Sequence, residues 1–285
     1  MQPFDYYKPK TFEEAFDYLT LPGKTVFPLA GATDFIPSYR DGVWQADAVC
    51  DIKALPGVRD LRETPEGLWV GACVLMSELA RSPLVRAHWE VLAQGAEVVG
   101  SEQVRNRATI GGNMCTASPC ADTPPPLYVL DAVVVLKSKA GERRVPVTEF
   151  FTFVRKTVVQ KGELVTGVII PKPPAGTVGE YHKLSRRQGC DLSLVSVAVL
   201  AAPRNGGYDW RIALGAVAPT PIRVPDAEAI LSKGWDAASI DEAAKAAEKT
   251  AKPITDVRSS DVYRYEMVRN LTRRAVRSVA EKLKK

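Results

Sequence analysis

Two short segments rich in small residues carry the clearest chemical signal in the sequence. They are "LAGATD" (Leu29 to Asp34) and "TIGGN" (Thr109 to Asn113), and each directly follows a segment that reads as a strand. Small side chains let backbone amides come within hydrogen-bonding distance of a ligand, and successive amides in a turn form a concavity that binds phosphate oxygens. The pair predicts a pyrophosphate site, although either segment alone also fits an ordinary turn.

Other reactive residue types do not form a recognisable catalytic or metal-binding set. Cys115 and Cys120 lie close together, but no second close pair completes a zinc or iron–sulfur ligand set. His88 falls in an expected helix and His182 in an expected strand, where structural roles are the simplest interpretation. Motifs of the Rossmann and P-loop types are missing from the sequence. The residues by themselves therefore predict no catalytic side chain and no metal.

The composition is that of an ordinary globular protein without a membrane span. Of 285 residues, 46% are hydrophobic and 25% are charged, and no apolar run approaches the roughly 20 residues that a span needs. The N-terminal "MQPFDYYKPK" lacks a secretory signal, and five irregularly spaced cysteines favour free thiols, so a cytoplasmic location is expected. The net charge of +5 owes much to the segment after Tyr263, which we interpret as a solvated helix face because it lacks the aromatic residues of nucleic-acid binders.

The first half of the chain places expected helices and strands around the first glycine segment. Thr11 and Glu14 form a capping box before a helix whose apolar residues share one face. The stretch from Val26 to Ala30 reads as a buried strand that ends at the glycine segment. A later helix is expected to start with Ser82 as its cap and Pro83 at its first position.

The second half of the chain reads as strands followed by helices. "DAVVVLKSKAGERRVPV" predicts a hairpin that turns at Ala140 and Gly141, and "PKPPAGTVGE" is the best candidate for a linker. Beyond it, "YHKLSRRQ", "LSLVSVAVLA" and "WRIALGAVA" read as strands. Ser239 with Glu242 forms a second capping box, and a terminal helix follows Ser260. This order of elements predicts an α+β fold with a domain boundary near residue 175.

Taken in order, several segments resemble the FAD-binding medium subunit of molybdenum hydroxylases of the xanthine dehydrogenase and carbon monoxide dehydrogenase family. They are "PFDYYKPKTFEEAFDYL", "LAGATDFIP", "VRNRATIGGNMCTASPCADTPPPLYVLDA", "YHKLSRRQGCDLSLVSVAVLA" and "APTPIRV", and they span nearly the whole chain. The resemblance implies a two-subdomain PCMH-type FAD-binding domain over residues 1–175, with subdomains of about 1–55 and 56–175. It also implies a smaller α+β C-terminal domain, an antiparallel sheet plus helices, over residues 176–285.

The same resemblance assigns the residues that would hold FAD. The two glycine segments would wrap its diphosphate through backbone amides, with side-chain hydrogen bonds from Thr33, Thr109 and Asn113. Asp122 matches the family's acidic position near the ribityl and phosphate region, and Lys183 matches a basic residue near the flavin. The full set is Leu29, Ala30, Gly31, Ala32, Thr33, Asp34, Thr109, Ile110, Gly111, Gly112, Asn113, Asp122 and Lys183.

Further expectations follow for particular residues. Asp34 and Asp122 must face hydrogen-bond donors, because a carboxylate near a diphosphate would otherwise be repelled. Ala32 stands where the family commonly has glycine, so we expect its φ to be negative. Small packing roles are expected for the cysteines without a family role, Cys115, Cys120 and Cys190.

The function that the resemblance implies is electron transfer by a flavoprotein subunit. In relatives, a large subunit hydroxylates the substrate at a molybdopterin cofactor, [2Fe-2S] clusters of a small subunit carry the electrons, and FAD delivers them to an external acceptor. The chain is then an oxidoreductase subunit of a heterotrimer, with no iron of its own, and its sequence identifies neither substrate nor acceptor. The alternatives are a self-sufficient flavin oxidase or reductase, which needs a substrate domain of its own, and a non-catalytic module whose glycine segments are ordinary turns.

Overall fold

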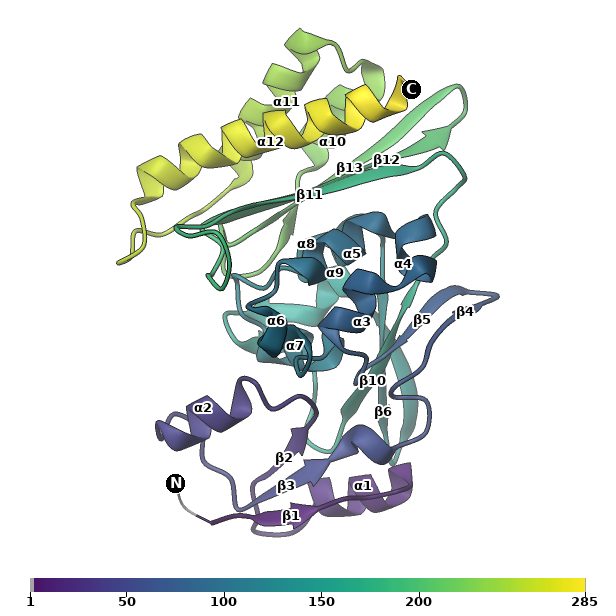
Figure 1. The fold of residues 1–285 in the computed structure, drawn as a ribbon, viewed down its shortest axis with the longest axis vertical. Coiled ribbons are helices and arrows are strands. Elements are labelled where there is room, and N and C mark those ends of the chain that lie inside the picture. The colour runs from purple at the N-terminus through teal and green to yellow at the C-terminus, as the bar shows by residue number, and fades with distance from the viewer. Residues whose placement is uncertain (1–2, 285) are drawn as a thin grey trace.

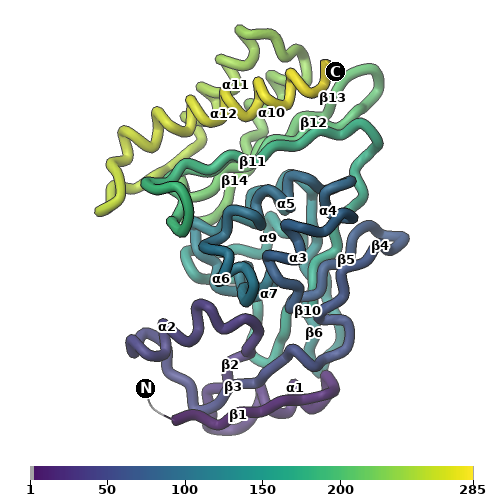
Figure 2. The backbone as a smooth tube through the Cα atoms, viewed as in Figure 1, coloured from purple at the N-terminus to yellow at the C-terminus, as the bar shows by residue number. Residues whose placement is uncertain are grey.

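The chain is arranged as three layers stacked along its longest axis. The computed structural model describes residues 3–284. Figure 1 places the N-terminal elements at one end, a mixed middle layer next to them, and the C-terminal sheet with its helices at the opposite end. The tube in Figure 2 follows the same order from purple to yellow. No helix within residues 3–284 is both long and apolar enough to traverse a membrane.

The N-terminal layer is a small parallel sheet with flanking helices. Its strands follow the order β1-β3-β2, and both outer strands pair with β3. Its elements are β1 (Asp5–Tyr7), α1 (Phe12–Leu19), β2 (Val26–Leu29), α2 (Phe35–Arg40), β3 (Ala48–Asp51) and a 3₁₀ turn (Ile52–Ala54). Thr11 caps α1 as predicted, while the Glu14 carboxylate accepts from the amide of Lys10, one residue before the cap. Strand β2 ends at Leu29, the first residue of the first glycine segment.

The middle layer is built on an antiparallel sheet of order β4-β5-β10-β6-β7. Its elements are β4 (Leu61–Thr64), β5 (Gly67–Gly71), α3 (Met76–Arg81), α4 (Pro83–His88), α5 (Glu90–Glu97), α6 (Glu102–Arg105), α7 (Ile110–Thr116), α8 (Pro124–Val129), β6 (Val133–Ser138), β7 (Gly141–Pro146), α9 (Val147–Phe150), β8 (Phe151–Phe153), β9 (Lys156–Thr157) and β10 (Leu164–Ile170). Every residue of β10 is buried, and α3, α5 and α8 contribute apolar residues to the same core. The second glycine segment begins α7, so this core fixes its position.

Two local predictions for the middle layer can be compared with the structure. The Ser82 hydroxyl caps α4, which begins with Pro83, as predicted. The hairpin of β6 and β7 pairs Ser138 with Gly141, so it turns one residue earlier than predicted. Gly141 has a φ of +122°, a conformation that L side chains rarely adopt, and glycine therefore suits the first residue of the returning strand.

The C-terminal layer is an antiparallel sheet of order β11-β12-β13-β14 with helices packed on it, which confirms the predicted α+β fold. Its elements are β11 (Val178–Leu184), β12 (Val195–Arg204), β13 (Gly207–Gly215), β14 (Ile222–Arg223), α10 (Pro225–Lys233), α11 (Ala237–Thr250) and α12 (Asp261–Leu283). The predicted capping box of Ser239 and Glu242 is wrong. Asp236 caps α11 instead, because its carboxylate accepts from the Ser239 amide and places a negative charge at the positive end of the helix.

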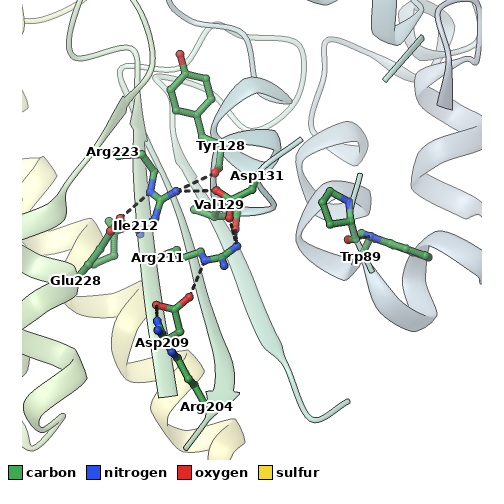
Figure 3. A network of polar contacts seen from close by, with 11 residues as sticks. Trp89, Tyr128, Val129, Asp131, Arg204, Asp209, Arg211, Ile212, Arg223 and Glu228 are labelled. Carbon is green, nitrogen blue, oxygen red and sulfur yellow. Dashed lines mark hydrogen bonds and ion pairs between the residues drawn. The ribbon is translucent and has the colours of Figure 1, made fainter. Parts of the chain in front are cut away.

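Two arginines of the C-terminal sheet join it to the middle layer (Figure 3). Arg211 of β13 donates to the Val129 carbonyl and pairs with Asp131, while Arg223 of β14 donates to the Tyr128 carbonyl and reaches the same Asp131. The two carbonyls belong to the last turn of α8, where carbonyls lack the partners of a helix interior, and that of Tyr128 accepts only one other hydrogen bond, from the Asp131 amide, within residues 3–284. Charge-assisted hydrogen bonds therefore fix the two layers relative to each other.

Candidate cofactor site

A cavity of about 880 Å³ lies between the N-terminal and middle layers. Both glycine segments line it, together with Trp44 from the N-terminal layer. Arg187 and residues 190–192 reach it from the C-terminal layer. The volume falls within the roughly 300–1,000 Å³ that is typical of small-molecule and cofactor sites.

The first glycine segment touches the two residues directly before the second one, Arg107 and Ala108, at the wall of this cavity. A Cβ added to Gly31 would lie 2.1 Å from the carbonyl oxygen of Arg107 and 3.1 Å from the Cα atom of Ala108. Only a residue without a side chain allows two backbones to approach so closely. The Thr116 hydroxyl, three residues beyond the second segment, donates to the carboxylate of Asp34, the last residue of the first segment, at 3.3 Å. Asp34 therefore faces a donor, as predicted.

The first glycine segment presents backbone amides that have no protein partner. Within residues 3–284, no atom accepts a hydrogen bond from the amides of Gly31, Ala32, Thr33 or Asp34. All four residues line the cavity. Gly31 is buried, Ala32 and Thr33 are half-buried and Asp34 is exposed, so a ligand in the cavity can supply the missing acceptors. A row of free donors on a cavity wall suits the oxygens of a diphosphate.

The prediction of a negative φ for Ala32 is wrong. Its φ is +62°, in the left-handed region that L residues seldom occupy. Asp34, two residues later, is right-handed, with φ of −98° and ψ of −36°. A Cβ in the left-handed region costs roughly 1–2 kcal/mol, so the rest of the fold must stabilise this turn.

The second glycine segment differs from the first because four of its five amides, those of residues 110–113, already have acceptors within residues 3–284. Ile110 and Gly111 donate to carbonyls of the segment that precedes α3, and Gly112 and Asn113 donate to the hydroxyl and carbonyl oxygens of Thr109. A Cβ on Gly112 would meet nothing within 4 Å except the Thr109 hydroxyl, at 3.0 Å. The segment therefore contributes open backbone surface to the cavity wall, whereas free amides were expected from it.

The three side chains expected to hydrogen-bond to FAD differ in whether the fold already uses them. The Thr109 hydroxyl caps α7 by accepting from Gly112, and the Asn113 oxygen accepts from the Thr123 hydroxyl at 2.7 Å. Thr33 has no hydrogen-bond partner for its side chain within residues 3–284. Of these three side chains, Thr33 is thus the one whose hydroxyl is unused by the fold.

Asp122 faces hydrogen-bond donors, as predicted. Its carboxylate accepts from the hydroxyls of Tyr181 at 2.8 Å and Ser193 at 2.7 Å, and from the Lys183 ammonium at 2.9 Å. Burial raises the pKa of Asp122, and the Lys183 charge and the two hydroxyls act in the opposite direction. Lys183 also donates to the Val98 carbonyl, so its ammonium is held by the protein on two sides.

All the predicted site residues line the cavity except Ile110 and Lys183. Ile110 is 1% exposed, and its side chain belongs to the core of the middle layer. Lys183 lies behind Asp122, which does line the cavity. Ile110 and Lys183 can therefore influence a ligand in the cavity only through the residues that they contact.

The structure adds cavity residues that sequence reasoning missed. Arg155, Thr157 and residues 163–165 come from the middle layer, and Arg187 and residues 190–192 come from the loop that joins β11 to β12. That loop begins within "YHKLSRRQ", which was read as a strand throughout, because β11 ends at Leu184. Gly189 within the loop has a φ of +112°, and a glycine between polar residues was the available signal for a turn.

The three cysteines without a family role also line the cavity. Cys120 is buried, as expected of a packing residue, and its sulfur accepts from Arg258 at 3.3 Å. The packing interpretation is wrong for Cys115 and Cys190, because both are exposed. The cavity therefore presents thiols as well as backbone donors.

The histidines lie away from the cavity. His88 ends α4 with its ring against that of Trp89, and His182 in β11 lies 3.7 Å from the Glu180 carboxylate. Within residues 3–284, no group of three or more His, Cys, Asp or Glu side chains is placed to hold a metal ion. The polar groups at the cavity therefore include backbone donors, the Asp122 and Lys183 pair, the thiols, and the side chains of Arg155 and Arg187.

Comparisons with known proteins agree with this geometry. Residues 2–173 match the family described as the FAD binding domain in molybdopterin dehydrogenase, and residues 180–279 match the CO dehydrogenase flavoprotein C-terminal domain. The carbon monoxide dehydrogenase medium chain of Hydrogenophaga pseudoflava is 31% identical over 274 residues, 96% of each chain. The glyceraldehyde dehydrogenase medium chain of Sulfolobus acidocaldarius is 31% identical over 279 residues, 97% of this chain and 98% of its own.

The likeness extends to the fold. A solved structure of carbon monoxide dehydrogenase from Hydrogenophaga pseudoflava, in a form that lacks the Mo-pyranopterin moiety of the molybdenum cofactor, contains a chain that matches this one with a TM-score of 0.94. The two are 32% identical, and the match covers 99% of each chain. The family resemblance seen in the sequence is thereby confirmed. This chain belongs to the family of FAD-binding medium subunits of molybdenum-containing dehydrogenases.

Proposed function

We propose that this chain is the electron-transfer flavoprotein subunit of a multi-subunit molybdenum hydroxylase. It would hold FAD in the cavity between the N-terminal and middle layers, with the diphosphate at the amides of Gly31 to Asp34. The observation that carries the proposal is this row of donors, because the described part of the fold provides no acceptor for them. Bound FAD would supply a ring that takes up and releases electrons.

The residues of this chain would bind and orient the cofactor, and none needs to act as an acid or base. Gly112 leaves room for close approach of the ligand to the backbone. Asp122 would accept hydrogen bonds from the sugar-like hydroxyls of the ribityl chain. Lys183, Tyr181 and Ser193 hold this carboxylate in one orientation from behind.

Electrons would enter and leave through other molecules. We propose a small subunit with [2Fe-2S] clusters, a large subunit with the molybdopterin cofactor and the substrate pocket, and an external electron acceptor. The relatives support this division, because medium chains of similar identity serve a carbon monoxide dehydrogenase and a glyceraldehyde dehydrogenase. The unpaired thiols of the chain fit a cytoplasmic location.

We also place the domain boundaries where the elements allow them. The segment between the end of β10 at Ile170 and the start of β11 at Val178 supports a boundary near residue 175. The FAD-binding domain would then cover residues 1–175 and the C-terminal domain residues 176–285. The 3₁₀ turn Ile52–Ala54 supports the subdomain boundary near residue 55.

Reconstitution of the full chain with FAD tests the proposal. Flavin-free protein incubated with FAD and then passed through a desalting column should retain the visible absorption bands of an oxidised flavin, and FMN, which lacks the diphosphate, should bind more weakly. A chain that stays colourless would refute FAD binding. Purification from the native source should bring two further chains with molybdenum and iron. Substrate-dependent flavin reduction by the chain alone would instead support a self-sufficient flavin enzyme.

A further inference from the structure

Lys53 lies directly behind the first glycine segment. It stands in the 3₁₀ turn Ile52–Ala54, which follows β3, the strand that pairs with β2. Its ammonium donates to the carbonyl of Ala30 at 3.2 Å and forms an ion pair with Asp51 at 2.7 Å. Among the described residues, Ala30 and Gly31 line the cavity and Lys53 does not. The ammonium therefore contacts the glycine segment from outside the cavity.

A buried carboxylate holds this ammonium in place. Asp51 is 2% exposed, and it also accepts from the backbone amide of Lys53 at 3.1 Å and from the Tyr6 hydroxyl. Burial by itself raises the pKa of Asp51, but hydrogen bonds from Lys53 and Tyr6 outweigh it and hold the pKa below its usual range. An ionised carboxylate fixed in this way leaves the Lys53 side chain little freedom, so it is a rigid support for whatever it contacts.

The planar peptide between Ala30 and Gly31 links the position of the Lys53 ammonium to the direction of the Gly31 amide. In a trans peptide, the carbonyl and the following N–H lie in one plane and point in opposite directions. When Lys53 holds the Ala30 carbonyl, the Gly31 amide must point away from Lys53. That amide is the first of the free donors on the cavity wall.

We propose that Lys53 is a positioning residue for the diphosphate, because it orients the first free amide without touching the ligand. The inference rests on the proposed function, since the ligand it concerns is the diphosphate of a dinucleotide. Asp51 compensates the charge of Lys53 at 2.7 Å, so orientation carries the effect and net charge does not. An effect of amide orientation and an effect of net charge predict opposite changes in ligand binding when the Asp51 charge is removed.

The experiment titrates the flavin-free full chain with FAD, ADP and riboflavin by calorimetry. ADP carries the diphosphate without the flavin, and riboflavin carries the flavin without phosphate. Lys53→Met should raise the Kd for FAD and for ADP about tenfold, equivalent to ~1.4 kcal/mol, and leave the Kd for riboflavin unchanged. Lys53→Arg keeps a donor and should restore the Kd to within about threefold of the unsubstituted chain. Lys24→Met breaks another Lys–Asp pair of the same layer and is the matched control.

Asp51→Asn separates orientation from charge. Asparagine keeps an acceptor for the Lys53 amide but leaves an uncompensated positive charge beside the glycine segment. Orientation predicts weaker ADP binding, whereas charge attraction predicts tighter binding. Tighter ADP binding by this variant, an unchanged Kd for ADP in Lys53→Met, or an equal loss for riboflavin would each overturn the inference. If the unsubstituted chain bound neither FAD nor ADP, the proposed function itself would fail, and the role of Lys53 with it.

Discussion

Replacing Gly31 by alanine tests whether the first glycine segment must touch the backbone that leads into the second. The added Cβ would lie 2.1 Å from the Arg107 carbonyl oxygen, and contacts under 3.0 Å essentially never occur at a real Cβ. The two backbones would have to separate by nearly an ångström, because a carbonyl oxygen cannot rotate away as a side chain can. Overpacking of this kind lowers the free energy of unfolding by about 1–3 kcal/mol. Each kcal/mol lowers the Tm by roughly 2–4 °C for a chain of this size.

The same displacement would carry the free amides away from the ligand. A hydrogen bond to a charged group contributes about 1.5–3 kcal/mol, so losing one should raise the Kd for FAD roughly tenfold to hundredfold. Thermal melting of the flavin-free protein measures the effect on the fold, and calorimetric titration with FAD measures the effect on binding. Both should change in Gly31→Ala.

Two other glycine variants are matched controls. In Gly112→Ala the Cβ meets only the Thr109 hydroxyl, at 3.0 Å, so melting should change little while the filled wall weakens FAD binding. In Gly207→Ala, at the start of β13, the nearest atom lies 3.9 Å away, and neither property should change. The reasoning would be refuted if Gly31→Ala bound FAD as tightly as the unsubstituted chain and melted at the same temperature.

Three further variants test the turn at Ala32, the contact between the C-terminal and middle layers, and the loss of stability in acid. Ala32→Gly should raise the free energy of unfolding by about 0.5–1 kcal/mol, because glycine takes a positive φ without steric cost; lower stability in urea would contradict this. Arg223→Met should lower the free energy of unfolding by about 1–2 kcal/mol, because it removes hydrogen bonds to the Tyr128 carbonyl and to the Asp131 and Glu228 carboxylates; calorimetry that shows no loss would mean the contact does not join the layers. Hydrogen bonds from Arg258 hold the pKa of Asp256 below its usual range, so the ionised form stabilises the fold above about pH 4 and this contribution disappears as the pH falls. Asp256→Asn should therefore be less stable at neutral pH, and its free energy of unfolding should fall less steeply as the pH is lowered. Chemical unfolding that shows the same fall in acid for the variant and the unsubstituted chain would contradict a stabilising contact between Asp256 and Arg258.

The positions of the two glycine turns could be predicted because their signal is local. Small residues directly after a strand are visible in the sequence, and the observed end of β2 at Leu29 places the first segment where it was expected. Caps are local as well, and Thr11 and Ser82 cap helices as predicted. The prediction that Ser239 caps α11 was wrong because Asp236, three residues earlier, is an equally good cap and carries a charge. Competition between two suitable residues is not resolved by the local pattern.

The unequal roles of the two glycine segments could not be predicted. Whether an amide is free depends on which carbonyl the tertiary structure brings to it. Ile110 and Gly111 find the carbonyls of Val74 and Ala72, whereas the amides of Gly31 and its neighbours find none among the described residues. The positive φ of Ala32 could not be predicted either, because L residues seldom occupy the left-handed region and the residue type gives no signal for it.

The surroundings of Asp122 show a similar limit. Its residue type was expected to require donors, but two of them, Tyr181 and Ser193, lie 59 and 71 residues away along the chain. Only the docking of the C-terminal sheet against the middle layer brings them to the carboxylate. Lys183 was expected beside the flavin, and the same docking places its ammonium against Asp122.

A crystal structure of the full chain with FAD is the most direct test of the central claim. We predict that diphosphate oxygens lie within about 2.7–3.2 Å of the amide nitrogens of Gly31 to Asp34. Lys53 should remain on the Ala30 carbonyl, outside the cavity. A diphosphate bound instead to side chains such as Arg155 or Arg187, with those amides facing water, would contradict the proposed mode of binding.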